Sequence, residues 1–342
     1  MPRFAPVLLA AIMFALAPTL CAQTALTPSP ASIGVNIAGG EFGSDKMPGT
    51  LWKDYVLPST AQLDYLKSKG CTVVRLPVAW ERLQPALGAP LDASKMKEMD
   101  EVVRASGARG IGILLDLHCY ARYKGVIVGS PDVSIEQFAD FWRRFALATK
   151  DEPGMWAYGL ANEPHDMEDA TRWPRAAQAA TDAIRAAGAK QWVFVAGDGW
   201  SGAWSWKTNN QNLDVRDPQN KIVYEAHQYF DDTSGTYKRS FDEEKPEPGR
   251  ATSRLKPFAD WLREKKQHGF IGEFGVPGAD RRWTPVLQEF VAAMKREGIG
   301  GTYWAMGAWW GEYPLSAEPV DGFQTDRVQM RVLVPYFDGA KK

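Results

Sequence analysis

Two glutamates, Glu163 and Glu273, stand directly after short apolar segments of the sequence. A carboxylate at the end of a hydrophobic strand is costly to desolvate, so it is expected either to form an ion pair or to perform chemistry. For one such glutamate, a structural ion pair, for example of Glu273 with Arg75, is as good an explanation as function. Two of them, at the ends of separate strands, favour function. The chemistry would be glycoside hydrolysis, in which one carboxylic acid protonates the leaving oxygen and a second carboxylate attacks the sugar or activates water.

Other polar and aromatic residues fall where predicted strands end, although each also has a structural explanation. Arg75 is expected to keep Glu273 ionised, because a guanidinium beside a carboxylate lowers its pKa. His227 is expected to lie beside Glu163. Aromatic rings in the loops are expected to line a groove, since pyranose C–H groups pack well on flat rings. The candidate supporting residues are Arg75, His118, Asn162, His227 and Tyr229, and the candidate substrate-binding residues are Trp200, Trp304, Trp310 and Tyr120.

Short apolar segments alternate with amphipathic segments along the chain, and this alternation predicts the fold. Strands are expected at 33–38, 72–78, 111–117, 155–161, 192–197, 222–226, 269–272 and 301–305. Helices are expected at 60–69, 93–105, 135–149, 173–187, 253–266 and 284–297. Such alternation is typical of a (β/α)8 barrel or of an open doubly wound sheet. No phosphate-binding glycine pattern follows the first strand, which counts against a dinucleotide fold. A single-domain barrel would bring the strand ends, and both glutamates, to one face.

Composition and the N-terminus indicate the setting. The chain has 342 residues, a net charge of −1 and 14 tryptophans, and it lacks the basic stripe that nucleic-acid binding requires. Residues 1–22 are predicted to be a signal peptide, because Arg3 precedes an apolar run that is too short to span a bilayer. A linker at 23–32 and a catalytic domain at 33–338 follow. We therefore expect a secreted or periplasmic protein without a membrane anchor after signal removal. Cys71 and Cys119 are expected at opposite strand ends, too far apart for a disulfide.

At these residues the sequence resembles glycoside hydrolase family 5, in particular its endo-β-1,4-glucanase branch. The matching segments are Gly34-Val35-Asn36-Ile37-Ala38-Gly39, Val74-Arg75-Leu76-Pro77-Val78-Ala79-Trp80, Leu115-Asp116-Leu117-His118, Asn162-Glu163-Pro164-His165-Asp166, Ala226-His227-Gln228-Tyr229, Gly272-Glu273-Phe274-Gly275 and Tyr303-Trp304-Ala305. They occur in order across nearly the whole mature chain. One departure is Cys119, where many relatives have asparagine.

The resemblance implies a cellulase that hydrolyses internal β-1,4-glucosidic bonds with retention of anomeric configuration, without a metal or other cofactor. It implies that Glu163 is the acid/base and Glu273 the nucleophile, with the supporting residues around the sugar that is attacked. The expected partner is a β-glucan polysaccharide or a cello-oligosaccharide. The same intermediate would allow transglycosylation when a sugar replaces water.

Several alternatives stay open at this point. A β-mannanase or a β-1,3-glucanase of the same family would differ only in loop geometry. A non-catalytic glucan-binding protein could share the fold. A serine hydrolase is suggested by Gly199-Trp200-Ser201-Gly202-Ala203, which approaches the nucleophile-elbow motif but ends in alanine. A metallohydrolase is less favoured, because the four histidines lack ligand spacing. The sequence leaves the oligomeric state open.

Overall fold

The computed structural model describes Met1 and residues 27–340. The predicted signal peptide at 1–22, apart from Met1, and residues 23–26 of the predicted linker lie outside the described residues. In the part of the chain that is described, none of the helices combines the length and the apolar character that crossing a membrane would require.

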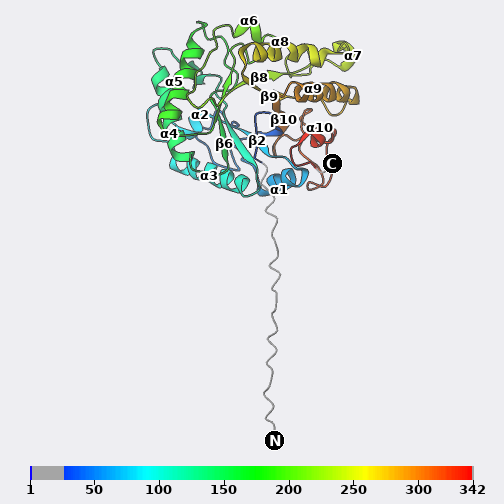
Figure 1. Cartoon of the computed structure of the whole chain (residues 1–342), viewed down its shortest axis with the longest axis horizontal. Helices are drawn as coiled ribbons and strands as arrows, with labels where there is room; N and C mark the ends of the chain where they lie inside the picture. Colours follow the sequence, from blue (N-terminus) through cyan, green and yellow to red (C-terminus); the bar gives the residue numbers. More distant parts are fainter. Residues whose placement is uncertain (2–26, 341–342) are drawn as a thin grey trace.

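Eight parallel strands form a closed barrel, whose neighbours follow the order β1-β10-β9-β8-β7-β6-β3-β2 (Figure 1). The strands are β1 Ile33–Ile37, β2 Val73–Val78, β3 Gly112–Leu117, β6 Met155–Gly159, β7 Trp192–Ala196, β8 Ile222–Gln228, β9 His268–Phe274 and β10 Gly300–Met306. Every strand end lies within two residues of its predicted position. The predicted (β/α)8 barrel is therefore confirmed, and the alternative of an open doubly wound sheet is excluded.

Helices lie outside the barrel and alternate with its strands (Figure 1). The six predicted helices are α1 Thr60–Lys69, α3 Ala93–Gly107, α4 Ile135–Thr149, α5 Arg172–Ala186, α8 Arg250–Lys265 and α9 Thr284–Arg296. Shorter helices are α2 Trp80–Leu83, α6 Trp206–Asn209, α7 Phe241–Glu244 and α10 Val328–Leu333. Ser59 and Ser134 begin α1 and α4 as capping boxes, in which a serine and a glutamine three residues later satisfy each other's backbone N–H groups. These two helices begin and end where the sequence predicts.

A small antiparallel hairpin in the loop after β3 was not predicted. Its strands are β4 Arg122–Tyr123 and β5 Val126–Ile127. Two-residue strands are too short to show an alternation of polar and apolar residues, so the sequence carries no pattern for them. The hairpin matters for function because it carries Arg122 toward the residues that follow β6.

On β3 and β8, the residues that point into the barrel change from apolar to polar along the strand. Leu114, Ala157, Phe194, Val223 and Phe270, from five adjacent strands, form a buried apolar cluster. Side chains two residues apart on a strand share a face, so on β8 the residues after Val223 that face inward are Glu225 and His227. On β3, Asp116 follows Leu114 in the same way. The inward polar residues thus gather toward the carboxyl ends of the strands.

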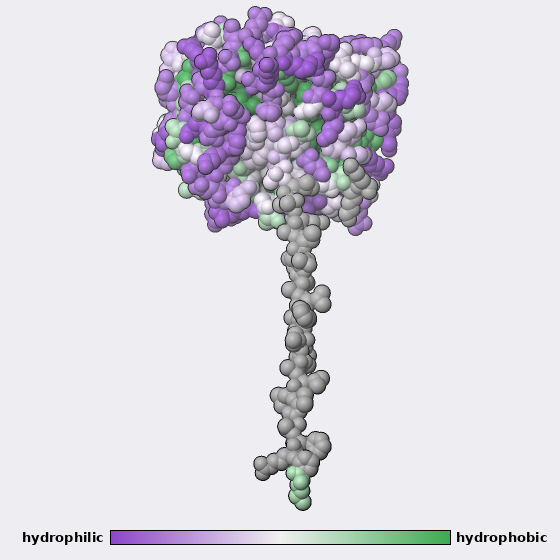
Figure 2. Space-filling view, viewed as in Figure 1, coloured by the Kyte–Doolittle hydropathy of each residue, from purple (hydrophilic) through white to green (hydrophobic). Residues whose placement is uncertain are grey.

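The space between the barrel and its helices is filled by a second, much larger apolar cluster. The face of the molecule in Figure 2 is mostly hydrophilic, with hydrophobic residues visible in patches. Cys71 and Cys119 are buried, free thiols, as predicted. Burial raises the pKa of Cys71 to about 12, so this thiol stays protonated and behaves as a small apolar side chain.

Gly34 on β1 should be essential for the barrel, because a Cβ atom at this position would overlap the backbone carbonyl oxygen of Val73 on β2. We predict that Gly34→Ala lowers the free energy of unfolding by about 3 kcal/mol, as overpacking against an immobile neighbour does. Gly159→Ala on β6 is a matched control, since its Cβ would lie 3.1 Å from the nearest atom. Urea denaturation followed by circular dichroism measures both. Equal loss in the two variants would contradict this account.

Candidate active site

The buried guanidinium of Arg75 organises the polar residues at the carboxyl ends of the strands. Its Nη1 lies 3.2 Å from Oε1 of Glu273, and its Nη2 lies 3.2 Å from Oδ2 of Asp116 and 2.9 Å from Oε1 of Glu225. Burial alone would lower the pKa of Arg75, but the three carboxylates raise it above its ordinary value. The cation is therefore permanent, and each carboxylate reaches it from a different strand.

Two asparagines also accept hydrogen bonds from the guanidinium, whose buried Nε has no hydrogen-bond partner among the described residues. Arg75 donates to Oδ1 of Asn36 at 3.0 Å and to Oδ1 of Asn162 at 2.7 Å. Asn36 in turn donates to the carbonyl of Gly272 at 2.8 Å, directly before Glu273. Asn162 directly precedes Glu163. Arg75 thus holds the backbone next to both candidate catalytic glutamates as well as the Glu273 carboxylate.

The structure brings Glu163 and Glu273 together, as predicted. One carboxylate oxygen of each, together with one ring nitrogen of His227, lie within 4.8 Å of one another. Glu163 has a left-handed backbone conformation with φ of 43°, which turns the chain immediately after Asn162. Tyr229 donates its hydroxyl to Oε2 of Glu273 at 2.9 Å. Burial, followed by the charge of Glu273, raises the pKa of Tyr229 well above its ordinary value, so this hydroxyl keeps its proton.

The pKa of Glu273 does not follow the sequence-based expectation. Burial raises it, and the nearby Glu163 raises it further, whereas His227 and Arg75 lower it. Arg75 therefore acts in the expected direction, but the net pKa of Glu273 lies above its ordinary value rather than below it. The prediction overlooked both the desolvation of a carboxylate inside the barrel and the second carboxylate facing it.

His227 connects the candidate acid/base to the charged cluster. Its Nδ1 lies 2.7 Å from Oε1 of Glu163, and its Nε2 lies 3.1 Å from Oε1 of Glu225. Burial lowers the pKa of His227, but Glu273 and the two carboxylates that it contacts outweigh burial and raise it to about 10. The ring is therefore protonated at neutral pH, and both of its nitrogens donate. Its predicted position beside Glu163 is confirmed.

His118, which follows β3, forms the opposite wall of the site. Its Nδ1 pairs with Oδ2 of Asp116 at 2.7 Å, and its ring stacks with that of Trp304 at 5.8 Å between centroids. Its Nε2 faces the Tyr120 hydroxyl at 3.3 Å and the amide of Asn162 at 3.4 Å. Burial acts to lower the pKa of His118, but Asp116 raises it above its ordinary value. His118 thus joins the Arg75 cluster through Asp116.

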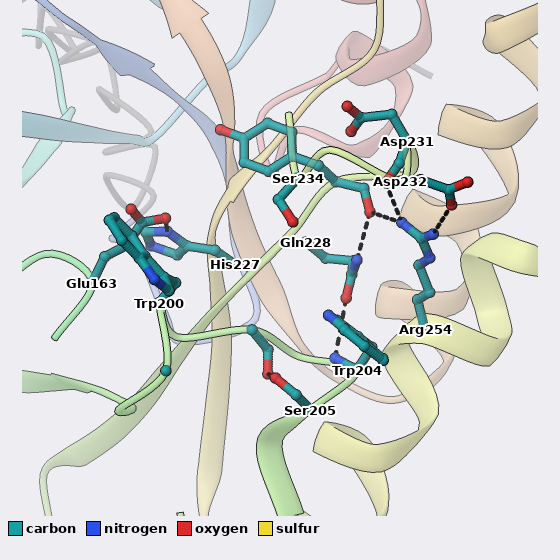
Figure 3. Close-up of a pocket in the computed structure, with 13 residues that line it drawn as sticks. Glu163, Trp200, Trp204, Ser205, His227, Gln228, Asp231, Asp232, Ser234 and Arg254 are labelled. Atoms are coloured by element: carbon teal, nitrogen blue, oxygen red, sulfur yellow. Dashed lines mark hydrogen bonds and ion pairs between the residues drawn. The ribbon is translucent and has the colours of Figure 1, made fainter. Parts of the chain in front are cut away.

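The cleft consists of two lobes, and Glu163 lines the first of them. The first lobe, of about 730 Å³, includes Glu163, Trp200, Trp204, His227, Gln228, Tyr229 and Arg254 in its lining (Figure 3). The second lobe, of about 890 Å³, is lined by residues that include Glu41, His118, Tyr120, Arg122 and Trp304. The rings of Tyr120 and Trp200 lie 6.0 Å apart between centroids, so the two linings are in contact there.

The predicted aromatic residues divide between cleft and interior. Trp200 is 52 % exposed in the first lobe, and Trp304 and Tyr120 line the second. Trp310 is not among the residues that line either lobe; it stacks on Tyr313 at 4.3 Å between centroids, and its Nε1 donates to the carbonyl of Met306. The structure therefore does not bring Trp310 to the cleft, because its ring is used in packing the loop after β10.

Sequence reasoning missed four residues at the site. Glu225 and Asp116 precede His227 and His118 by two positions, and this spacing could have indicated a shared face of each strand. Glu41 lies in the loop after β1, where no periodic pattern exists; burial raises its pKa to about 6 although His118 acts to lower it. Trp204 lines the cleft and is 63 % exposed, whereas nearby Trp206 is fully buried. Nothing in the loop sequence distinguishes these two indoles.

Glu163, His227 and Glu273 are also the group of described residues whose donor atoms lie close enough together to hold a metal ion. The electrostatics oppose such use. A protonated His227 has no free lone pair to offer a metal, because both ring nitrogens carry hydrogens directed at carboxylates. The Arg75 cation, 3.2 Å from Glu273, would also repel a metal ion. The arrangement fits acid–base and nucleophilic chemistry better than ligation.

Ser201 does not form a nucleophile elbow. It is fully buried, its Oγ donates to the carbonyl of Glu225 at 2.5 Å, and it accepts a hydrogen bond from the backbone N–H of Gly197 at 2.9 Å. The hydroxyl therefore links the loop after β7 to β8 and faces neither lobe. The serine hydrolase alternative has no support in this geometry.

Comparison with known proteins identifies relatives along nearly the whole described chain. Residues 35–309 match the family described as cellulase (glycosyl hydrolase family 5). Endo-beta-1,4-glucanase B of Emericella nidulans is 36% identical over 295 residues, which cover 84% of this chain and 86% of that protein.

Two solved structures have the same fold. Pseudomonas stutzeri endoglucanase Cel5A in complex with cellobiose has a TM-score of 0.86 and 33% identity, over 91% of this chain and 94% of that one. XacCel5A in complex with cellopentaose has a TM-score of 0.84 and 37% identity, over 90% of this chain and 99% of that one.

His227 should make the folded state less stable at alkaline pH. The pKa of His227 is raised from 6.5 to about 10. Its contribution to the free energy of unfolding is therefore complete below pH 6.5 and is lost as the pH rises toward 10. We predict that His227→Asn removes on the order of 3 kcal/mol of this pH-dependent loss. Urea denaturation from pH 6 to 10 measures the slope. His268→Asn, at the exposed start of β9, should retain the wild-type slope, and a wild-type slope in His227→Asn would refute the assignment.

Proposed function

The chain belongs to the cellulase family, glycosyl hydrolase family 5, and from this premise we propose that it hydrolyses internal β-1,4-glucosidic bonds by double displacement. Glu273 is the nucleophile, and Glu163 is the acid/base. The observation that carries the proposal is that one carboxylate oxygen of Glu163 lies within 4.8 Å of one of Glu273. Retaining glycosidases hold this pair about 5–5.5 Å apart, whereas inverting enzymes separate it by about 6.5–9.5 Å to admit a water molecule.

The surrounding contacts support these two roles. Glu273 accepts from Tyr229 on one oxygen and from Arg75 on the other, which fixes the carboxylate for attack on the anomeric carbon. Glu163 is reached by the Nδ1–H of His227 and lines the first lobe, where a leaving sugar would lie. The proposed reaction requires a proton on Glu163 and an ionised Glu273 at its start.

The reaction then follows in two steps. Glu273 attacks the anomeric carbon and the glycosidic C–O bond breaks, while Glu163 gives its proton to the departing oxygen. Glu163 next takes a proton from water, whose oxygen attacks the anomeric carbon and releases Glu273. Both steps invert the centre, so the product retains the β configuration. When a sugar hydroxyl replaces water, the same intermediate gives transglycosylation.

A β-1,4-glucan chain is the substrate that fits best. The two lobes, the first lined by Glu163 and the second by His118 and Trp304, would offer room for sugars before and after the cleaved bond, which internal cleavage requires. Trp200 in one lobe and Trp304 in the other supply flat surfaces for pyranose rings. The relatives named above are endoglucanases, and two were solved with cellobiose or cellopentaose bound.

The N-terminal residues indicate where the protein acts. Residues 1–22 have the composition of a signal peptide, so the proposed site of action is outside the cytoplasm.

A non-catalytic glucan-binding protein is disfavoured, because both carboxylates and their supporting cluster are intact. A β-mannanase or another β-glucanase remains the nearest alternative within the family, since these differ in the loops that line the lobes.

Replacing either carboxylate should abolish hydrolysis. We predict that Glu163→Gln and Glu273→Gln each lower kcat/KM on cellopentaose by at least about a thousandfold, whereas Ser201→Ala stays active. Proton NMR of the wild-type reaction should show β-anomeric product first. Initial α product would refute retention, and an active Glu273→Gln with an inactive Ser201→Ala would refute the assignment of the nucleophile.

A panel of polysaccharides distinguishes the activities within the family. We predict the highest rate on carboxymethylcellulose or amorphous cellulose, and lower rates on mannan and on laminarin, a β-1,3-glucan. Crystalline cellulose should be a poor substrate, because a chain must leave its neighbours before it can enter a cleft between two lobes. Release of reducing sugar measures every rate. A higher rate on mannan would replace the glucanase proposal with a mannanase, and equal rates on crystalline and amorphous cellulose would refute the argument from the cleft.

A further inference from the structure

His165 lies where three loops of the cleft meet. Its ring stacks on that of Trp200 with centroids 3.5 Å apart and planes 8° from parallel. The edge of Tyr120 approaches the same ring at 5.8 Å. Arg122 donates to the His165 carbonyl at 2.9 Å. The loops after β3, β6 and β7 are therefore joined at this one residue, which is half-buried and carries none of the catalytic steps proposed above.

His165 is also tied to the candidate acid/base. Its Nδ1 lies 3.0 Å from the backbone carbonyl of Glu163. A carbonyl oxygen only accepts hydrogen bonds, so Nδ1 carries the hydrogen and the ring is oriented by this contact. The position of the Trp200 ring is thus set relative to the backbone of Glu163, two residues before His165.

Trp200 needs such support, because its own backbone leaves the ring on a turn of unusual conformation. Trp200 and Ser201 have φ values of 60° and 55°, in the left-handed region. The turn is fixed by the Trp200 N–H, which donates to the carbonyl of Pro164 at 3.1 Å, and by the buried Ser201 hydroxyl. The indole itself is 52 % exposed, and the ring of His165 stacks on it at 3.5 Å between centroids, whereas that of Tyr120 lies 6.0 Å away.

We propose that His165 is a positioning residue, which holds Trp200 as the platform for the sugar on the leaving-group side of the cleaved bond. This inference rests on the proposed function. Glu163 gives its proton to the leaving oxygen and lines the same lobe as Trp200, so the leaving sugar lies in that lobe (Figure 3). His165 covers one face of the indole, and the other face is left for the sugar.

The two contacts of the His165 ring can be separated by substitution. His165→Phe keeps a flat ring against Trp200 and loses the hydrogen bond to Glu163. His165→Asn keeps an amide that can donate near the position of Nδ1 and loses the ring. If the stacking contact carries the function, the phenylalanine variant should resemble the wild type and the asparagine variant should not. His268→Asn is the matched control, because His268 packs edge-on against Trp192 at the opposite end of the barrel.

The test compares two substrates that differ on the leaving-group side. Cellopentaose places sugars in both lobes, whereas β-cellobiosyl fluoride has only fluoride as its leaving group. With the fluoride, the C–F bond breaks as the bond from Glu273 to the anomeric carbon forms. Because the leaving group is fluoride and not a sugar, no sugar contacts Trp200. We predict that His165→Asn lowers kcat/KM on cellopentaose about fivefold, the worth of one good aromatic contact, and mainly through KM. Its kcat/KM on the fluoride should stay within about twofold of the wild type.

Each other outcome overturns the inference in a distinct way. Equal losses on both substrates would mean that His165 acts on the catalytic pair or on folding. An unchanged His165→Asn would mean that Trp200 needs no support. Equal losses on cellopentaose in the phenylalanine and asparagine variants would mean that the hydrogen bond is needed as much as the ring, and that the stack alone does not carry the role. A wild-type enzyme inactive on both substrates would overturn this inference together with the proposed function.

Discussion

One buried cation makes the polar centre of this barrel possible. Three carboxylates inside a closed sheet would repel one another and would each lose their hydration. Arg75 faces all three within 3.2 Å, and it is held in turn by Asn36 and Asn162. Because burial of a lone charge is so unfavourable, this arrangement is stable only as a complete set. The position of the Glu273 carboxylate is therefore fixed by residues of β2, β3 and β8, which never contact the reacting bond.

The charged centre constrains the strands around it. A Cβ atom on Gly272 would overlap Oε1 of Glu225, the oxygen shared by Arg75 and His227. Glycine at this position of β9 is therefore required by the neighbouring carboxylate and not by backbone conformation. Below this layer, Val223 and Phe270 close the barrel with apolar packing. The same strands thus serve stability at one end and chemistry at the other, as the change from apolar to polar inward residues requires.

The sequence predicts which strand-end residues form this site better than it predicts their pKa values. Strand ends carry strong signals, because apolar runs stop at residues that a core would not contain, and Glu163 and Glu273 were found in this way. The net rise in the pKa of Glu273 depends on burial and on the facing carboxylate, which no local pattern encodes. Loop aromatics are equally ambiguous: Trp204 is exposed in the cleft, Trp206 is buried, and Trp310 packs on Tyr313. Their surroundings come from distant segments, so only the folded chain distinguishes them.

The charged cluster also couples the two halves of the proposed reaction. Oε1 of Glu225 lies 2.9 Å from Arg75, which contacts Glu273, and 3.1 Å from His227, which contacts Glu163. The contact with Glu225 helps to raise the pKa of His227, and the Nδ1–H of this protonated ring donates to Glu163. When Glu273 becomes an ester and loses its charge, Arg75 keeps two carboxylate partners and need not move. The cluster can therefore pass through both charge states of the carboxylate pair without rearrangement, which is the property that a preorganised site requires.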